Sequence, residues 1–230
     1  MRPHEFRSAR LAKGWTQSQA ATRLGMTQAY LNYLENGKRR LTPELVRRAT
    51  SVYGLSLRCL PVADVFVPVE TSDQYLAEAL STLGYPGFRY LRSHTEKKHP
   101  NEFLLTALAQ KSLDGRVAEA LPWVVANSAE LNSWLVENAR KFNLQNRLGF
   151  VVSLARRAVD KLNAAAKATA LDHLQLLLDD SRLAKEDYFY RPPRTESEGQ
   201  WLRTNRTDDA VHWNLLTDMK PEHLQYAGQS

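Results

Sequence analysis

The sequence of 230 residues contains one cysteine, Cys59, and therefore cannot form an internal disulfide. A single thiol fits a reducing compartment, where it is most simply a buried side chain. No run of about 18 apolar residues is present, so the sequence predicts no membrane-spanning helix. The first ten residues also lack the apolar stretch of a secretory signal. From these absences we expect a cytoplasmic protein.

The sequence also lacks the short motifs that mark common catalytic and cofactor sites. It has no phosphate-binding G-x-x-x-x-G-K-[ST], no nucleophile G-x-S-x-G, no zinc-binding H-E-x-x-H and no dinucleotide-binding glycine pattern. His94 and His99 are five residues apart, which fits one helix face poorly, and His173, His212 and His223 are isolated. We therefore expect no catalytic residue, no metal site and no cofactor, and the protein is not predicted to be an enzyme.

Positive charge is concentrated near the N-terminus. The whole chain carries a net charge of +6. Residues 1–60 hold eleven basic and three acidic residues, a net charge of +8, which leaves −2 for residues 61–230. A local basic excess is the electrostatic footprint of a segment that neutralises nucleic-acid phosphates. A nucleic-acid contact is therefore expected in the first quarter of the chain, with a solvated basic segment as the alternative.

Residues 16–37 predict two short helices joined at a glycine. Thr16 and Gln19 have the spacing of a capping box, in which the two side chains satisfy backbone N–H groups at a helix start. Three apolar residues then fall on one face: Ala20, Ala21 and Leu24. Gly25 stands where a left-handed residue is needed for a sharp turn.

The second of these helices predicts a polar outer face. Thr27 is its expected N-cap, Gly37 follows its end, and Tyr30, Leu31 and Leu34 form its expected buried stripe. The outward residues are Gln28, Ala29, Asn32 and Tyr33. Gln and Asn can bond adenine N6 and N7, and an Ala methyl can contact the thymine methyl. An ordinary amphipathic hairpin with a solvated face is the alternative for this segment taken alone.

The flanking segments predict further helices. The upstream stretch FRSARLAKGW indicates a helix with Phe6, Ala9 and Leu11 inward that closes near Gly14. Downstream, Thr42 and Pro43 form a helix start that extends to about Tyr53 and is stopped by Gly54.

This order of helices over residues 4–57 resembles the phage-repressor (XRE) family of helix-turn-helix regulators. The marks of the resemblance are Arg10 with Glu35, the Thr16-Gln17 helix start, Gly25 and the stretch ENGK at 35–38. It implies a five-helix-type domain, an internal ion pair between Arg10 and Glu35, and a phosphate contact from Gln17. It also places Gln28, Ala29, Asn32 and Tyr33 over the bases. Ala20 departs from the family, which usually has Leu there, and we expect Trp15 to fill the space.

Just past the reading helix, Lys38, Arg39 and Arg40 are positioned to meet phosphate. The candidate DNA-binding residues are therefore Gln17, Thr27, Gln28, Ala29, Asn32, Tyr33, Lys38, Arg39 and Arg40.

The remainder predicts a connector and a larger helical domain. Residues 55–73 break the helical pattern with Pro61 and Pro68, so we expect a DNA-binding domain at 1–60, a linker at 61–74 and a second domain at 75–230. Expected helix starts are Asn101, Asp114 and Ser128, and a last helical region spans 196–219. The predicted fold class is all-α, with neighbouring helices antiparallel.

The second domain suits binding better than catalysis. Its tail, residues 198–227, is rich in Trp, Leu and Arg, which are favoured at interface hot spots, although a helix folded onto its own core has the same composition. Residues 76–92 and 104–160 resemble the helical half of XRE-type regulators encoded beside a toxin. That resemblance implies an antitoxin that neutralises a toxin and represses its own operon.

We therefore predict a repressor that binds a palindromic double-stranded DNA operator as a homodimer, with a toxin as protein partner. Three alternatives remain open from the sequence. The second domain can bind a small molecule that controls repression, or it can be only a dimerisation platform. The chain can also be an accessory to nucleic-acid processing that its helix-turn-helix recruits.

Overall fold

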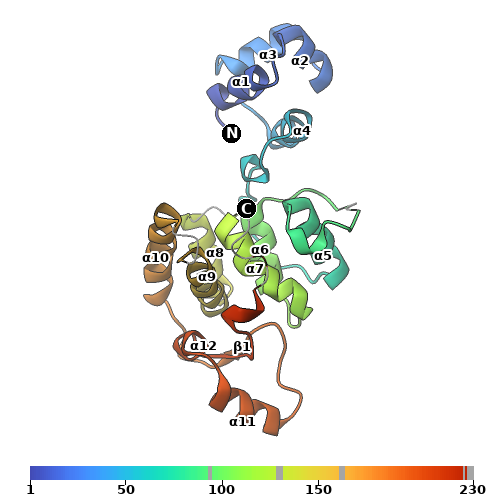
Figure 1. Cartoon of the computed structure of the whole chain (residues 1–230). Coiled ribbons are helices and arrows are strands. Elements are labelled where there is room, and N and C mark those ends of the chain that lie inside the picture. The colour runs from blue at the N-terminus through green and yellow to red at the C-terminus, as the bar shows by residue number, and fades with distance from the viewer. Residues whose placement is uncertain (93–94, 128–131, 161–163, 225, 227–230) are drawn as a thin grey trace. The chain divides into compact units, whose positions relative to one another are not determined.

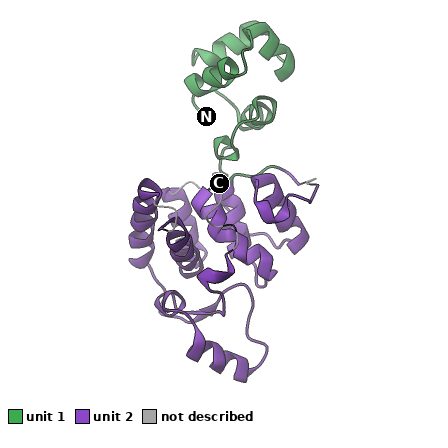
Figure 2. Ribbon diagram, in the orientation of Figure 1, with its two compact units in different colours: residues 1–63, 97–99 green, residues 64–96, 100–230 purple. Residues whose placement is uncertain are grey.

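The computed structural model describes residues 1–92, 95–127, 132–160, 164–224 and 226 (Figure 1). Contacts within the chain divide it into two compact units (Figure 2). The first unit comprises residues 1–63 with 97–99, and the second comprises residues 64–96 and 100–230. Among the described residues, no helix has both the length and the apolar character needed to cross a membrane.

The first unit contains four α-helices and one 3₁₀ turn in its described part. They are α1 (Pro3–Ala12), α2 (Gln17–Leu24), α3 (Gln28–Glu35), α4 (Pro43–Tyr53) and η1 (Leu57–Cys59). The five-helix expectation places a last helix after α4, and the structure has the 3₁₀ turn η1 at that position.

The all-α fold class of the chain is confirmed.

Local signals set the bounds of these helices. The hydroxyl of Thr16 accepts from the backbone N–H of Gln19, and the Gln19 side chain accepts from that of Thr16, so the predicted capping box forms. The hydroxyls of Thr27 and Thr42 likewise accept from the backbone N–H groups of Tyr30 and Leu45 and cap α3 and α4. Gly25 adopts φ +66°, the left-handed conformation that ends α2, as predicted.

The core of the first unit is built on Phe6, Leu24, Leu31, Leu34 and Tyr53. Phe6 and Trp15 each pack against Tyr53, with ring centroids 5.7 Å apart in both pairs. Trp15 is partly buried against this cluster.

Two residues predicted to point inward are exposed. Leu11 is 56% exposed and Tyr30 is 38% exposed. The buried face of α1 contains Arg10, and the buried face of α3 contains Glu35. An apolar pattern leaves out these charged residues, so it predicted Leu11 and Tyr30 on the buried faces instead.

The second unit is a helical array with a minor strand pair. Its longer helices are α5 (Asp73–Leu83), α6 (Pro100–Leu108), α7 (Gly115–Asn127), α8 (Ser133–Lys141), α9 (Gln145–Asp160) and α10 (Ala165–Asp179). The chain then forms α11 (Glu196–Asn205) and α12 (Asp208–His212), with 3₁₀ turns η2 (Pro86–Phe88) and η3 (Pro221–His223). Strands β1 (Asp187–Tyr188) and β2 (Leu215–Leu216) pair in parallel, Asp187 opposite Leu215. Helix α9 is central and packs against both α7 and α10.

The C-terminal part of this unit is fastened to α9 by Trp213. Its indole is fully buried and donates from Nε1 to the Ser153 hydroxyl at 2.9 Å. A Cβ added at Gly149 would lie 2.4 Å from the indole, so only glycine permits this approach. The helical region expected over 196–219 is therefore broken: the chain leaves α12, buries Trp213 and enters β2.

The beginning of the second unit also differs from expectation. Phe66 is buried edge-on to Phe142, with ring centroids 5.5 Å apart. The Gln110 side chain donates to the Val69 carbonyl at 2.9 Å and accepts from the Thr71 N–H at 3.1 Å. The stretch predicted as a linker at 61–74 thus packs on the second unit from Phe66 onward, because the Phe66 ring is buried there and the Gln110 side chain bonds its backbone.

The expected helix starts in this unit have three outcomes. Asp114 directly precedes α7 and its carboxylate accepts from the Arg116 N–H, as predicted. Asn101 lies fully buried inside α6 rather than at its cap, and donates to the Asn132 side chain. Asn132 itself caps α8. Ser128 lies outside the described residues.

Candidate nucleic-acid interface

The outer face of α3 is available to a ligand. Gln28, Ala29 and Tyr33 are exposed, and Asn32 is half-buried. Thr27 is exposed as well, but its hydroxyl accepts from the Tyr30 N–H, so its first role is to cap the helix. These residues come from two successive turns of one helix, which is the geometry needed to follow base edges along a groove.

A basic loop follows α3 directly. The backbone N–H groups of Lys38 and Arg39 both donate to the Tyr33 carbonyl, at 2.8 and 3.3 Å, which folds the loop back against the end of the helix. Gly37 allows this turn with φ +71°. Lys38, Arg39 and Arg40 are exposed, and within the described residues no carboxylate pairs with Arg39 or Arg40. Their charge is therefore free to neutralise phosphate.

A buried ion pair supports α3 from its inner side. Arg10 donates from Nε to Oε1 of Glu35 at 2.6 Å and from Nη2 to Oε2 at 3.0 Å. The side chains are 8% and 1% exposed. A third donor, Arg10 Nη1, reaches the Trp15 carbonyl at 2.8 Å. The pair implied by the resemblance is thus present, and it ties α1 and the loop after it to the end of α3.

Hydrogen bonds continue from this pair to the exposed face. Gln17 donates from Nε2 to Oε2 of Glu35 at 2.9 Å, and its Oε1 accepts from Asn32 Nδ2 at 3.5 Å. Asn36 donates to Asn32 Oδ1 at 3.1 Å. The resemblance implied that Gln17 touches phosphate, whereas here both atoms of its amide bond other side chains. Gln17 therefore also positions Asn32, and Asn36 joins it there. No local pattern in the sequence signals either role.

The ion pair determines the charge states behind α3. Burial favours a raised pKa at Glu35, but hydrogen bonds from Arg10 and Gln17 outweigh it and hold that pKa below its usual value. Burial, assisted by the nearby Glu35 charge, raises the pKa of Tyr53 to about 12. Its buried hydroxyl has no hydrogen-bond partner among the described residues. At neutral pH, Glu35 is charged and Tyr53 is a neutral phenol.

Two arginines, Arg23 and Arg48, make further contacts that hold α2 in place. The Arg23 guanidinium lies 4.3 Å from the centroid of the Trp15 ring. Arg48 donates to the Leu24 carbonyl at 3.0 Å, which satisfies the C-terminal end of α2 from α4. The turn between α2 and α3 is therefore held by the rest of the unit.

The histidines beyond residue 90 do not form a ligand cluster in the described part of the chain. No group of three His, Cys, Asp or Glu residues lies close enough to hold a metal ion there. His212 bonds Asp179 through Nε2 at 2.6 Å, an exposed link between α12 and α10. His94 lies outside the described residues, and His99 is buried.

Comparison with known families identifies the helix-turn-helix segment. Residues 6–58 match the family model HTH_3, described as helix-turn-helix. The match confirms the XRE-type assignment of this segment and supports a DNA-binding transcription regulator. It covers less than a quarter of the chain. No match was found among curated proteins, and none among solved structures.

Proposed function

We propose that this helix-turn-helix protein is a repressor that reads a palindromic operator through α3, with two copies bound to the two half-sites. The observation that carries the proposal is the face of α3, where exposed Gln28 and Ala29 adjoin half-buried Asn32 and end at the unpaired cations Arg39 and Arg40. Groups suited to base edges and groups suited to phosphates are thus adjacent on one surface.

The two classes of residue have separate tasks. Gln28 and Asn32 carry amides that can bond two edge atoms of adenine at once, so they supply the sequence preference. Lys38, Arg39 and Arg40 neutralise phosphates whatever the sequence, so they supply affinity and register. The net charge of +8 on residues 1–60 favours the same segment as the DNA-binding part.

Selection of duplexes from a random-sequence library with the full chain tests this function. We expect an enriched palindrome whose half-sites are about 10 base pairs apart, as two helix-turn-helix units require. Footprinting of the enriched duplex should show protection of both half-sites. Enrichment of no sequence, or of a single half-site bound by one copy at full affinity, would count against the proposal.

We further propose that the second unit makes the repressor an antitoxin by binding a toxin protein. Support comes from residues 65–69, where Val65, Val67 and Val69 are each more than half exposed while Phe66 is buried between them. An exposed apolar strip of this kind suits a protein surface better than an enclosed small-molecule site. Residues 61–230, which include this unit, carry a net charge of −2, and that charge does not favour phosphate.

Co-expression with the product of the adjacent gene tests the antitoxin proposal. We expect that product to arrest growth alone and to be neutralised by this chain. Replacing the three valines by serine should abolish neutralisation and leave operator binding intact, whereas Leu176→Ser, an equally exposed change on α10, should leave both intact. Release of the operator by a small molecule, without any protein partner, would favour the ligand-responsive alternative.

A further inference from the structure

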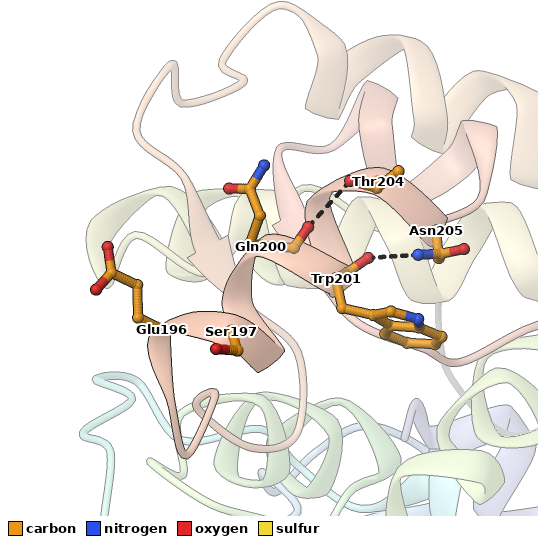
Figure 3. Close-up of a pocket in the computed structure, with 6 residues that line it drawn as sticks. All are labelled: Glu196, Ser197, Gln200, Trp201, Thr204 and Asn205. Carbon is orange, nitrogen blue, oxygen red and sulfur yellow. Dashed lines mark hydrogen bonds between the residues drawn. The ribbon is translucent and has the colours of Figure 1, made fainter.

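Helix α11 presents an unusual outer face. It contacts β2 and buries only Gly199 and Leu202 on its inner side. Trp201 is 54% exposed, whereas Trp213 is fully buried. The indole borders a depression of about 570 Å³ on the helix surface (Figure 3). The residues that line it are Glu196, Ser197, Gln200, Trp201, Thr204 and Asn205.

Two polar side chains beside the indole already have hydrogen-bond partners. Thr204 donates to the Gln200 carbonyl at 3.1 Å, and Asn205 donates to the Trp201 carbonyl at 2.8 Å (Figure 3). Because these donors are satisfied within the helix, burial leaves them with partners. An exposed aromatic residue whose surroundings are polar and uncharged, apart from Glu196, has the composition of an interface core.

The two ends of α11 carry opposite charges. Glu196 and Glu198 lie in its first turn, and Arg203 lies in its last turn. Glu196 is exposed and has no ionic partner among the described residues, while Arg203 binds Glu186 and remains nearly half exposed. A second α11 aligned antiparallel brings acidic and basic ends together and opposes the helix dipoles, whereas a parallel alignment brings like charges together. The face is therefore complementary to itself in one orientation.

We propose that α11 pairs antiparallel with α11 of a second copy about a two-fold axis near Trp201. The indole of each copy enters the depression beside Ser197 and Thr204 of the other. The inference rests on the proposed dimeric repressor and names the surface that joins its two copies. An isologous contact of this kind closes after two subunits.

The size of the face sets the strength of the contact. A helix of ten residues is about 15 Å long, and its one face is small beside the roughly 1,200–2,000 Å² that stable complexes bury. The copies therefore associate weakly in free solution. Adjacent half-sites raise the effective concentration of one copy near the other, and the same contact then produces cooperative DNA binding.

Sedimentation velocity of the full chain over a concentration series tests the contact without DNA. We expect the weight-average sedimentation coefficient to rise with concentration for the wild type and to stay at the monomer value for Trp201→Ala. Leu176→Ala, which removes an exposed apolar side chain elsewhere in the unit, should behave like the wild type. Unchanged association of Trp201→Ala, or a wild type that is monomeric throughout, would overturn the proposal.

Disulfide trapping tests the orientation, in a Cys59→Ser background. Antiparallel pairing about Trp201 places residue 197 of one copy opposite residue 205 of the other. A mixture of Ser197→Cys and Asn205→Cys chains should therefore form the mixed disulfide several-fold faster than either variant forms a homodimer. A preference for the homodimeric disulfides would contradict the antiparallel arrangement.

These measurements are independent of the DNA-binding proposal. If the wild type associates through Trp201 but selects no DNA sequence, the repressor function fails and the dimer surface stands. If it selects a palindrome but Trp201→Ala binds both half-sites with unchanged cooperativity, the repressor stands and the α11 surface is wrong.

Discussion

Gln17 donates a hydrogen bond to the buried carboxylate of Glu35 at 2.9 Å, and the other end of the same amide accepts a longer one from Asn32 at 3.5 Å. The first residue of α2 therefore connects the ion pair inside the unit to a candidate base-reading residue on its surface. Stability and sequence preference share this side chain, so a single substitution should change both.

Gln17→Met tests that connection, since it preserves length and removes the hydrogen bonds. We expect a loss of about 1–2 kcal/mol in the free energy of unfolding, because one bond to a charged group disappears. Operator selectivity should fall as Asn32 loses its support. Urea unfolding and competition binding measure the two effects. Thr22→Ala, exposed on the same helix, should leave both nearly unchanged.

Loss of the Glu35 charge should destabilise the first unit strongly. Glu35→Gln leaves the buried Arg10 without its counter-charge, and we expect a cost of about 3–5 kcal/mol at pH 7. Glu44→Gln, which removes an exposed partner of Arg48, should cost less than about 1 kcal/mol. Equal effects of the two substitutions in urea unfolding would show that the Arg10–Glu35 pair does not stabilise the unit.

The same pair predicts a dependence of stability on pH. The pKa of Glu35 is lowered in the folded protein, so its contribution is present above the unfolded value of about 4.3 and is lost as pH falls through the folded value. Wild-type stability should therefore decline below about pH 4.3. Glu35→Gln should lack this part of the decline, and the two unfolding curves should converge in acid.

Gly149→Ala should destabilise the second unit although alanine favours helices. A helical Gly→Ala change is ordinarily worth about 0.5–1 kcal/mol of stability. Here the new Cβ would lie 2.4 Å from the Trp213 indole, and we expect a net loss of about 1–3 kcal/mol. Gly115→Ala is the matched control, because nothing lies within 4 Å of its Cβ position. Thermal unfolding followed by tryptophan fluorescence measures the difference.

Arg39→Ala and Arg40→Ala should weaken binding to every DNA sequence alike. Each removes one phosphate neutralisation, so the slope of log affinity against log salt should become shallower by about 0.9. Arg194→Ala removes an exposed arginine from the second unit and should leave the slope unchanged. Salt titrations with the operator and with an unrelated duplex provide the comparison. A change in selectivity without a change in slope would assign these arginines to bases.

Local signals in the sequence predicted most of the first unit. The capping residues Thr16, Thr27 and Thr42 and the glycines 25 and 54 fix where helices begin and end, and they act within a few residues. The apolar pattern predicts Leu11 and Tyr30 inward because it contains no charged residues. Arg10 and Glu35 lie on the buried faces of α1 and α3, and a pattern of apolar residues cannot predict a buried pair of charges.

Contacts between distant residues limited the prediction elsewhere. Trp213 packs on Gly149 across more than sixty residues, and neither position signals the other locally. Gln17 was given a phosphate contact by resemblance, while its bonds to Glu35 and Asn32 depend on how α2 and α3 cross. Phe66 looked like part of a connector because its partners, Trp134 and Phe142, come much later in the chain.

The most direct test of the account is the affinity of a Gln28→Ala/Asn32→Ala double variant for the duplex that the wild type selects. Each side chain should contribute about 1–3 kcal/mol of discrimination, so the variant should lose its preference for that duplex over a scrambled one and keep the wild-type affinity for the scrambled duplex. Unchanged affinity and unchanged selectivity in the double variant would contradict the assignment of α3 as the helix that reads DNA.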